Sequence, residues 1–274
     1  MKKRLKLMVC ASLLLLVAGI GPASAKSLMM ATTTSTDNTG LLDYLAPKFE
    51  EATGIELKWT AVGTGKALEM GRNCDVDVLL VHAPPAEKAY VENGYGVDRT
   101  QIMYNDFVLI GPADDPAGIK GQSVTEALQA IAAAEAQFFS RGDNSGTNKK
   151  ELLLWDQAGV DLPEKAEWYL ETGRGMISTL TMADERDGYT LTDRGTYIKY
   201  ADNNDGNPKL KILVEGDASL FNQYSALVVN PERCSGVKED LARAFINWMV
   251  SDRAQEAIGD FRLLGKKLFN PNAQ

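Results

Sequence analysis

The stretch of chain from Ser140 to Thr147, with the sequence SRGDNSGT, combines an arginine, hydroxyl side chains and glycines. Ser145 suits the N-cap of a helix through the residues that follow, which leaves the backbone N–H groups of Gly146 and Thr147 without helical partners. A helix N-terminus attracts anions through such donors and through the helix dipole. Arg141 adds a forked cation that does not deprotonate. The stretch therefore predicts a tetrahedral-oxyanion site; the alternative is an ordinary capped helix beside a solvated arginine.

Hydroxyl side chains are also concentrated in an earlier loop, residues 32–40, with the sequence TTTSTDNTG. This loop follows a short apolar strand and precedes leucines at helical spacing, so it has the same strand, loop and helix order as the first stretch. Thr33, Thr34 and Ser35 are expected to supply neutral hydrogen-bond donors to the same anion. The alternative is a plain polar loop, since Ser, Thr and Asn are common in loops.

Three further residues are candidates because each lies near the end of a strand. Thr64, between two glycines, is expected to cap a helix and to contact the anion, although the run around it lacks the hydroxyl residue that a P-loop needs after its lysine. His82, the only histidine, directly follows the apolar strand 75–81, where open α/β sheets bind ligands; a structural histidine is the alternative. Arg194 is a second candidate cation, with a surface turn as its alternative.

These candidates require a fold that brings several distant loops together. Apolar strands alternate with helical patterns along the chain, which predicts an α/β fold of mostly parallel sheets with flanking helices. With the hydroxyl loops in one half and Arg141 in the other, the ligand would lie in a cleft between two lobes. The expected lobes are residues 26–106 with 215–274, and residues 107–214. The final amphipathic helix is expected to cover residues 238–258.

The first 25 residues have the composition of a secretory signal peptide. A basic start precedes the apolar residues 7–20, and Ala23-Ser24-Ala25 is a small-residue cleavage site. Cys10 lies inside the apolar run, which argues against a lipoprotein. No later apolar stretch approaches the roughly 20 residues of a membrane span, so a soluble, periplasmic protein is expected.

Composition argues against several classes of protein. The net charge of −8 becomes more negative once the basic leader is removed, which disfavours nucleic-acid binding. The chain has no Gly-x-Ser-x-Gly motif, and a single histidine excludes a His-rich metal site, so an enzyme such as a secreted phosphatase is a remote alternative. Cys74 and Cys234 can pair in an oxidising compartment if one lobe holds both.

Four segments together resemble one family. They are Ala31-Thr32-Thr33-Thr34-Ser35, Val81-His82-Ala83-Pro84, Ser140 to Thr147, and Tyr189 to Tyr197, in this order across nearly the whole chain after the leader. They are similar to the tungstate-binding periplasmic receptors of ABC importers, a group of the two-lobed type II periplasmic binding proteins. The resemblance implies a monomer that holds tungstate in its cleft, without a cofactor or a metal cation, and delivers it to a membrane permease.

The choice of anion depends on this resemblance. Tungstate and molybdate share charge and shape, so the residues do not separate them, and phosphate is a further alternative. In phosphate receptors an aspartate stands at the place of His82 and accepts the proton of the bound phosphate. A pocket of donors only would leave that P–OH group unpaired at a cost of about 1–3 kcal/mol, which would favour a fully deprotonated dianion. The alternative is that Asp143 or Asp193 supplies an acceptor for that proton.

Overall fold

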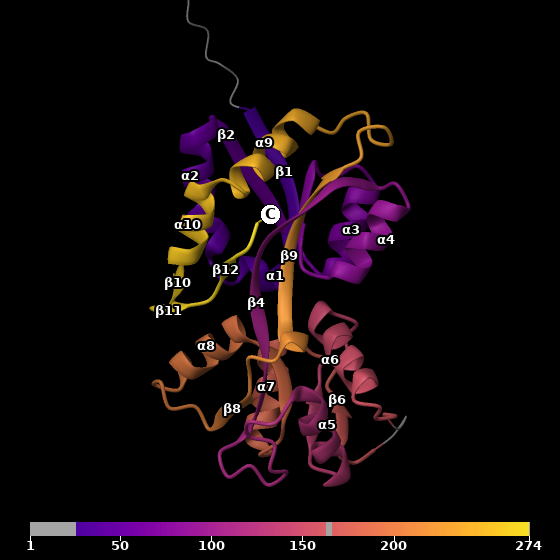
Figure 1. Ribbon diagram of the computed structural model, residues 1–274, viewed down its shortest axis with the longest axis vertical. Coiled ribbons are helices and arrows are strands. Elements are labelled where there is room, and N and C mark those ends of the chain that lie inside the picture. The colour runs from indigo at the N-terminus through magenta and orange to yellow at the C-terminus, as the bar shows by residue number, and fades with distance from the viewer. Residues whose placement is uncertain (1–25, 163–165, 274) are drawn as a thin grey trace, which may run out of the picture.

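The computed structural model describes residues 26–162 and 166–273, and the expected signal peptide, residues 1–25, lies outside them. Two long strands, β4 (Gly96–Pro112) and β9 (Phe221–Val229), join two bodies (Figure 1). The upper body holds the elements before β4 and after β9, and the lower body holds the elements between them. Within the described ranges, no helix is both long and apolar enough to cross a membrane.

The upper body is organised around β1, which lies between two parallel neighbours, β2 and β3. All four residues of β3 are buried, as the apolar run before His82 predicts for an inner strand. Helices follow each strand and cover the sheet. The elements are β1 (Lys26–Thr33), α1 (Thr34–Asp37), α2 (Leu41–Thr53), β2 (Ile55–Val62), α3 (Thr64–Arg72), β3 (Val78–Val81) and α4 (Pro84–Glu92).

The lower body alternates helices and strands in the same way. Its short strands β5 and β6 pair in parallel, and a single parallel bridge joins Phe138 to Tyr189. The elements are α5 (Val124–Ala133), β5 (Phe138–Ser140), α6 (Gly146–Gln157), β6 (Tyr169–Glu171), α7 (Met176–Glu185), β7 (Thr190–Asp193), α8 (Arg194–Asn203), β8 (Leu210–Val214) and the 3-10 helix η1 (Ala218–Leu220).

The strands β4 and β9 run side by side in opposite directions between the bodies. In the upper body β9 pairs with β3, and in the lower body β4 pairs with β7 and β8; all of these pairings are antiparallel. The expected parallel pairing therefore holds for β1 with β2 and β3 and for β5 with β6, but not for the crossing strands. The chain crosses once in each direction, and adjacent strands of opposite direction can pair only in the antiparallel manner.

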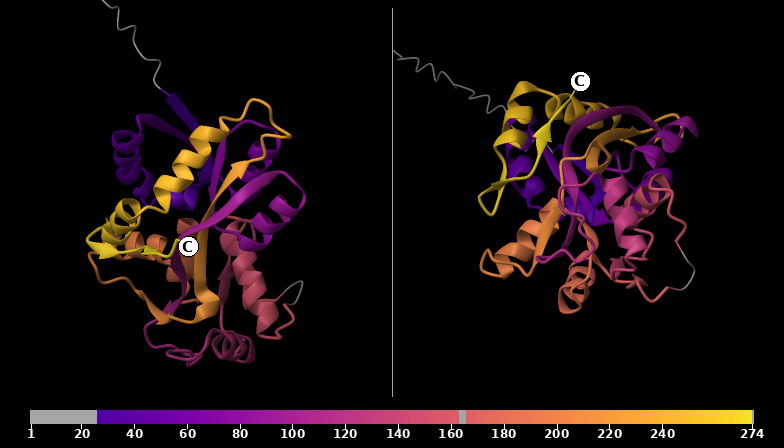
Figure 2. Two further views of the ribbon diagram at one scale, coloured as in Figure 1. Left: turned by 45° about the horizontal axis from the view of Figure 1, so that its top comes forward. Right: turned by 60° about the horizontal axis from the view of Figure 1, so that its bottom comes forward.

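After β9 the chain returns to the upper body, where its yellow helices lie against the first elements (Figure 2). The single helix expected over residues 238–258 is wrong, because α9 (Glu239–Met249) ends before α10 (Asp252–Asp260) begins. Ser251 separates the two helices in an extended conformation, and its side chain accepts a hydrogen bond from the Ala254 N–H. The chain then forms the short strands β10 (Arg262–Leu263), β11 (Lys266–Lys267) and β12 (Asn270–Pro271).

Each body has its own apolar core. In the upper body Phe49 packs edge-on against Phe245, with ring centroids 5.4 Å apart. In the lower body Phe138 packs edge-on against Trp155, with centroids 5.1 Å apart. Two separately packed bodies joined by a pair of strands have the construction of proteins that close around a ligand by hinge motion.

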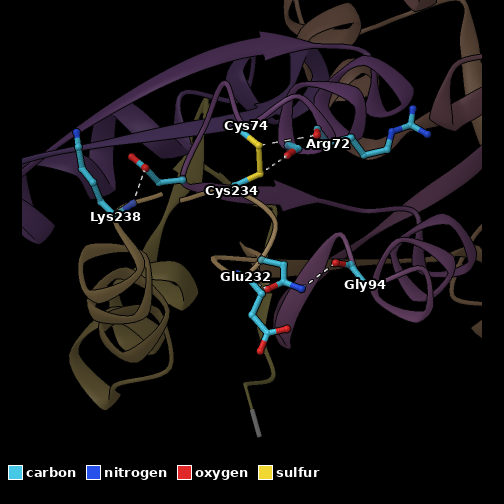
Figure 3. Close-up of a disulfide and its surroundings, with 9 residues drawn as sticks. Arg72, Cys74, Gly94, Glu232, Cys234 and Lys238 are labelled. Atoms are coloured by element: carbon cyan, nitrogen blue, oxygen red, sulfur yellow. Dashed lines mark hydrogen bonds between the residues drawn. A yellow bond between two sulfur atoms is a disulfide. The ribbon is translucent and has the colours of Figure 1, made fainter. Parts of the chain in front are cut away.

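A disulfide between Cys74 and Cys234 stabilises the upper body, with Cα atoms 5.4 Å apart (Figure 3). Cys74 lies just after α3, and Cys234 lies in the turn that follows β9. Beside it, the Lys238 N–H donates to Asp77 at 2.9 Å, so that a buried carboxylate also fixes this turn. The disulfide therefore links the early part of the chain to the part that returns from the lower body.

Candidate functional site

A cavity of about 640 Å³ lies between the two bodies. Its walls come from the starts of α1 and α3 and the end of β3 in the upper body, and from the start of α6 in the lower body. The structure thus brings together every residue of the predicted site except Arg194. The predicted residues that line the cavity are Thr33, Thr34, Ser35, Thr64, His82, Arg141, Ser145, Gly146 and Thr147.

Thr33 and Ser35 stand at the carboxyl end of β1, and both contact His82. Thr33 is buried and caps α1, because its Oγ1 accepts from the Thr36 N–H at 3.2 Å. Its hydroxyl lies 3.0 Å from His82 Nε2, and the Ser35 hydroxyl lies 3.0 Å from the same nitrogen. Thr34 between them is exposed. The hydroxyl loop and the histidine therefore form one hydrogen-bonded unit in the cavity wall.

His82 is held on its other side by a chain of amides. Its Nδ1 lies 2.9 Å from Asn222 Oδ1, and the Asn222 amide donates to Asn105 Oδ1 at 2.7 Å. The ring also lies over Tyr224, with centroids 4.6 Å apart. Burial lowers the pKa of His82, opposed by the hydrogen bond to Asn222 and by the charge of Asp193. The imidazole is therefore neutral near pH 7 in the unliganded protein.

The start of α3 forms a second part of the upper wall. Thr64 is the first residue of α3 rather than its N-cap, which is Gly63. Lys66 also lines the cavity, and its Nζ donates to Glu69 at 3.0 Å. Only Thr64 is predicted from the Gly-Thr-Gly-Lys run as a contact to the anion, although the same run also places a cation, Lys66, at a helix start.

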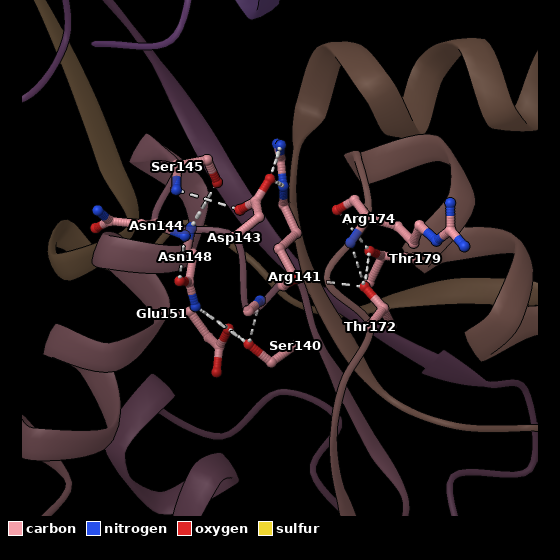
Figure 4. A network of polar contacts seen from close by, with 11 residues as sticks. Ser140, Arg141, Asp143, Asn144, Ser145, Asn148, Glu151, Thr172, Arg174 and Thr179 are labelled. Atoms are coloured by element: carbon pink, nitrogen blue, oxygen red, sulfur yellow. Dashed lines mark hydrogen bonds and ion pairs between the residues drawn. The ribbon is translucent and has the colours of Figure 1, made fainter. Parts of the chain in front are cut away.

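In the lower wall, α6 begins at Gly146 and Ser145 caps it, as predicted, by accepting from the Asn148 N–H. Arg141 lies in the loop before the helix with 19% of its side chain exposed, and donates to Asp143 from Nε at 3.1 Å and from Nη2 at 2.5 Å (Figure 4). Partial burial raises the pKa of the Asp143 carboxyl, but the hydrogen bonds from Ser145 and Arg141 outweigh this effect, so the pKa is lowered. A guanidinium has five N–H groups, so Arg141 keeps donors for an anion.

Glu151 supports this loop from the interior (Figure 4). It is 3% exposed and accepts from the Ser140 hydroxyl at 2.5 Å. It also accepts from the Tyr169 hydroxyl at 2.7 Å and the Trp155 ring N–H at 3.0 Å. Burial raises the pKa of Glu151, and these donors oppose the rise. Ser140 Oγ in turn accepts from the Gly142 N–H at 3.2 Å. The network therefore fixes the backbone from which Arg141 projects.

Gly142 itself satisfies two steric demands of the loop. Its φ of +58° lies in the left-handed region that favours glycine. A Cβ at this position would also lie 2.6 Å from Glu171 Cβ. The glycine beside Arg141 is therefore required by the close packing of the loop against β6.

We expect Glu151→Gln to lower the free energy of unfolding by about 1–3 kcal/mol. The NH₂ group of the glutamine would replace one carboxylate oxygen and face side chains that now donate to that oxygen, which leaves a buried polar group unpaired. Denaturant unfolding monitored by tryptophan fluorescence measures this loss. The matched control is Glu256→Gln on the exposed face of α10, which should change stability by less than about 0.5 kcal/mol. Equal stabilities of the two variants would contradict a supporting role for Glu151.

Arg194 is not among the residues that line the cavity, and its role as a second site cation stays a prediction. Its Nε and Nη2 donate to Asp106 at 2.6 and 2.5 Å, and Nη2 also donates to Glu215 at 2.7 Å. The hydrogen bonds that Arg194 donates to Asp106 and Glu215 raise the pKa of its guanidinium, although burial opposes the rise. The guanidinium links α8 to β4 and to the segment after β8, and two carboxylates occupy its donors.

Two carboxylates, the alternative acceptors named in the sequence analysis, line the cavity, so its wall does not consist of donors only. Asp143 pairs with Arg141, and Asp193 caps α8 by accepting from the N–H and hydroxyl of Thr196 at 2.8 and 2.6 Å. A carboxylate offers about four acceptor positions, so both keep lone pairs for a protonated ligand. Nothing in the local sequence distinguishes these acids from surface caps, and only the meeting of the two bodies brings them to one cavity.

A third helix start, that of α7, completes the lower wall and was not predicted as part of the site. Gly175 is its N-cap, and the residues from Gly175 to Ser178 line the cavity. The helices α3, α6 and α7 therefore all begin at this cavity, where their free N–H groups and dipoles favour an anion. The two glycines before Met176, Gly173 and Gly175, were the available signal in the sequence.

Within residues 26–162 and 166–273, no group of three or more His, Cys, Asp or Glu residues is placed to hold a metal ion.

Comparisons with known proteins agree with this architecture. A family model described as the PBP superfamily domain matches residues 21–253. The tungstate-binding protein TupA of Campylobacter jejuni is 50% identical over 235 residues, which are 86% of this chain and 87% of that protein. The chain therefore belongs to the PBP superfamily and, within it, to the TupA family.

Solved structures give the same result. The tungstate binding protein TupA from Desulfovibrio alaskensis G20 is 66% identical, with a TM-score of 0.86 over 91% of this chain and 100% of that chain. The structure described as the tungstate ABC transporter from Geobacter sulfurreducens is 47% identical, with a TM-score of 0.76 over 86% of this chain and 98% of that chain. The two-lobed α/β fold expected from the sequence is thus confirmed.

Proposed function

We propose that the protein captures tungstate in the cavity between its two bodies and delivers it to the membrane permease of an ABC importer. The observation that carries the proposal is the convergence of Arg141, Lys66, a hydroxyl loop and the N-termini of α3, α6 and α7 on one cavity. Charged and neutral donors arranged in this way suit an anion. Relatives that are named for tungstate binding, and that match most of this chain, support tungstate as that anion.

In this proposal each body supplies one half of the anion's hydrogen-bond donors. Thr33, Thr34, Ser35 and Thr64 act from the upper body, with His82 holding the first of these hydroxyls. Ser145, Gly146 and Thr147 act from the start of α6, with Arg141 beside them. Tungsten is held as an oxyanion through its oxygens, so no metal cation and no resident cofactor is involved.

Capture requires the two bodies to approach each other, because a cavity of about 640 Å³ is much larger than an anion with four oxygens. The walls already come close at Gly146, where an added Cβ would lie 3.5 Å from Thr64 Oγ1 and 3.6 Å from His82 Cε1. We propose closure between lobes of residues 26–106 with 215–274 and residues 107–214, with β4 and β9 as the hinge. The anion stabilises the closed form by bonding to both lobes, and the permease recognises that form.

The role is binding rather than catalysis, and one copy of the chain holds one anion. Export by the leader in residues 1–25 would place the protein in the periplasm, where it meets the outer face of its permease. The net charge of −8 disfavours binding to nucleic acid, and it requires local groups to hold the anion against the overall negative charge.

Molybdate and phosphate are the alternative ligands. Molybdate presents the same charge and shape as tungstate to every donor in the cavity. One observation supports phosphate as the alternative ligand. Asp143 and Asp193 line the cavity wall, and either carboxylate can accept the proton of a P–OH group.

Calorimetric titration of the chain without residues 1–25 distinguishes these ligands. We expect one-to-one binding of tungstate and molybdate, weaker binding of phosphate and no binding of sulfate above background. Phosphate that binds more tightly than tungstate would reassign the receptor to phosphate. If none of the four anions binds, an oxyanion receptor is the wrong function.

A further inference from the structure

The hydrogen-bond directions around His82 are fixed by its partners. The amide oxygen of Asn222 can only accept, so His82 Nδ1 carries the hydrogen in the 2.9 Å bond between them. The orientation of that amide is set in turn, because its nitrogen donates to Asn105 Oδ1 at 2.7 Å. A neutral imidazole has only one N–H group, so its Nε2 carries a lone pair that faces the hydroxyl loop.

In the neutral state this lone pair competes with an anion for hydroxyl hydrogens. Thr33 and Ser35 each have one hydroxyl hydrogen, and each oxygen lies 3.0 Å from Nε2. The hydroxyl that donates to Nε2 cannot donate into the cavity at the same time. A deprotonated oxyanion accepts hydrogen bonds only, so the neutral ring withholds one donor from it.

A protonated ring reverses this arrangement. The Nε2–H then donates to a hydroxyl oxygen, and the one hydroxyl hydrogen that the neutral ring held, from Thr33 or Ser35, is released from the ring. A bound dianion also favours the imidazolium, since an opposite charge nearby stabilises a charged group. Burial lowers the pKa of His82 in the unliganded protein, so the proton is absent near neutral pH until the anion arrives.

Charged groups line both of the hollows that His82 lines. On the cavity side these are Asp193 before α8, Asp143 and Arg141 before α6, and Lys66 on α3. On the other side, Lys149 and Lys150 of α6 line a second hollow with His82, and Tyr224 of β9 lies against the ring. Acids and bases both surround the ring, so a dianion in the cavity is the largest change of charge that His82 meets.

We propose that His82 takes up one proton when the oxyanion binds, and so changes from an acceptor of hydroxyl hydrogens to a donor that releases them to the ligand. This inference depends on the proposed oxyanion-binding function and adds a proton-linked, ligand-positioning role for His82. The sign of the pH dependence follows. The binding constant rises as the pH falls through the higher pKa of the complex, by up to about tenfold per pH unit, and levels off below the lower pKa of the free protein.

The single histidine permits a direct test. In the tag-free protein labelled with ¹⁵N, long-range ¹H–¹⁵N correlation spectra report whether each ring nitrogen carries a hydrogen. At pH 7.5 we expect the neutral ring with the hydrogen on Nδ1, and a doubly protonated ring after saturation with tungstate. A ring that stays neutral while tungstate is bound would overturn the inference and leave the proposed function intact.

Calorimetry supplies a second readout that does not depend on any variant. Titrating tungstate at pH 7.5 in buffers with different ionisation enthalpies counts the protons exchanged. We expect uptake that approaches one proton per anion, and an uptake of zero would overturn the inference. If no oxyanion binds in any buffer, the proposed function and this inference both fail.

Two variants assign the proton to this residue. His82→Gln places an amide that does not titrate near the hydroxyls, and should abolish the proton uptake and flatten the pH dependence of the dissociation constant. Asn222→Asp places a carboxylate against Nδ1, and should shift the pH dependence to higher pH. Undiminished proton uptake in a folded His82→Gln protein would assign the proton to another group and overturn the inference.

Discussion

Replacing Arg141 with alanine is expected to weaken tungstate binding by about 2–5 kcal/mol, or roughly 30-fold to several-thousand-fold in the dissociation constant. The guanidinium is a permanent charge in the cavity wall, and its side chain is only 19% exposed. Its loss removes charge-assisted hydrogen bonds to the anion and also leaves Asp143 without its partner, a negative charge beside the ligand. Calorimetric titration of the variant with tungstate measures the effect.

Two comparisons make this result specific. Arg253→Ala removes the same charge from α10, where the side chain is 60% exposed, and should leave the affinity within about twofold of the original. Arg141→Lys keeps the positive charge but lacks the forked guanidinium. Its affinity for tungstate should lie between those of the original protein and Arg141→Ala. An Arg141→Ala protein that binds tungstate as tightly as the Arg253→Ala control would remove this residue from the site.

Loss of the disulfide is expected to lower the free energy of unfolding by about 2–5 kcal/mol. The bond joins residues 160 positions apart in sequence, and closing so long a loop restricts the unfolded chain strongly. It also ties the turn after β9 to the end of α3. Denaturant unfolding of the Cys74→Ser, Cys234→Ser double variant, compared with the oxidised protein, measures the loss.

A reducing agent provides the control for this second prediction. It should lower the stability of the original protein toward that of the double variant and should leave the double variant unchanged. The affinity for tungstate at a temperature where both proteins are folded should change little, since both cysteines lie outside the cavity lining. Equal stability of the oxidised protein and the double variant would show that the cysteines do not pair.

Local features were the most predictable part of this protein. The cap of Ser145 on α6 follows from contacts within one helical turn, which a short stretch of sequence contains. The break at Ser251 was missed because the apolar periodicity continues across it, although a serine with an extended backbone ends one helix and caps the next. Amphipathic spacing alone does not reveal such a break.

The partners of charged side chains were the least predictable part. Arg141 and Arg194 both stand near a helix start, and the sequence made both of them candidates. The fold places Arg141 in the cavity wall and surrounds Arg194 with Asp106 and Glu215, from segments far away along the chain. It also brings Lys66 and Asp193 to the cavity. Coulomb and hydrogen-bond interactions act over a few ångströms, so only the folded chain decides which charges meet.

The sequence by itself determined the α/β alternation, the capped helix start beside Arg141 and the hydroxyl loop, because each depends on backbone preferences of neighbouring residues. Only the tertiary structure decided that nine predicted residues share one cavity, and that Cys74 meets Cys234. It also decided that His82 lies between the hydroxyl loop and Asn222. These contacts join residues far apart in sequence, and they form because β4 and β9 cross between two separately packed cores and hold the two walls face to face.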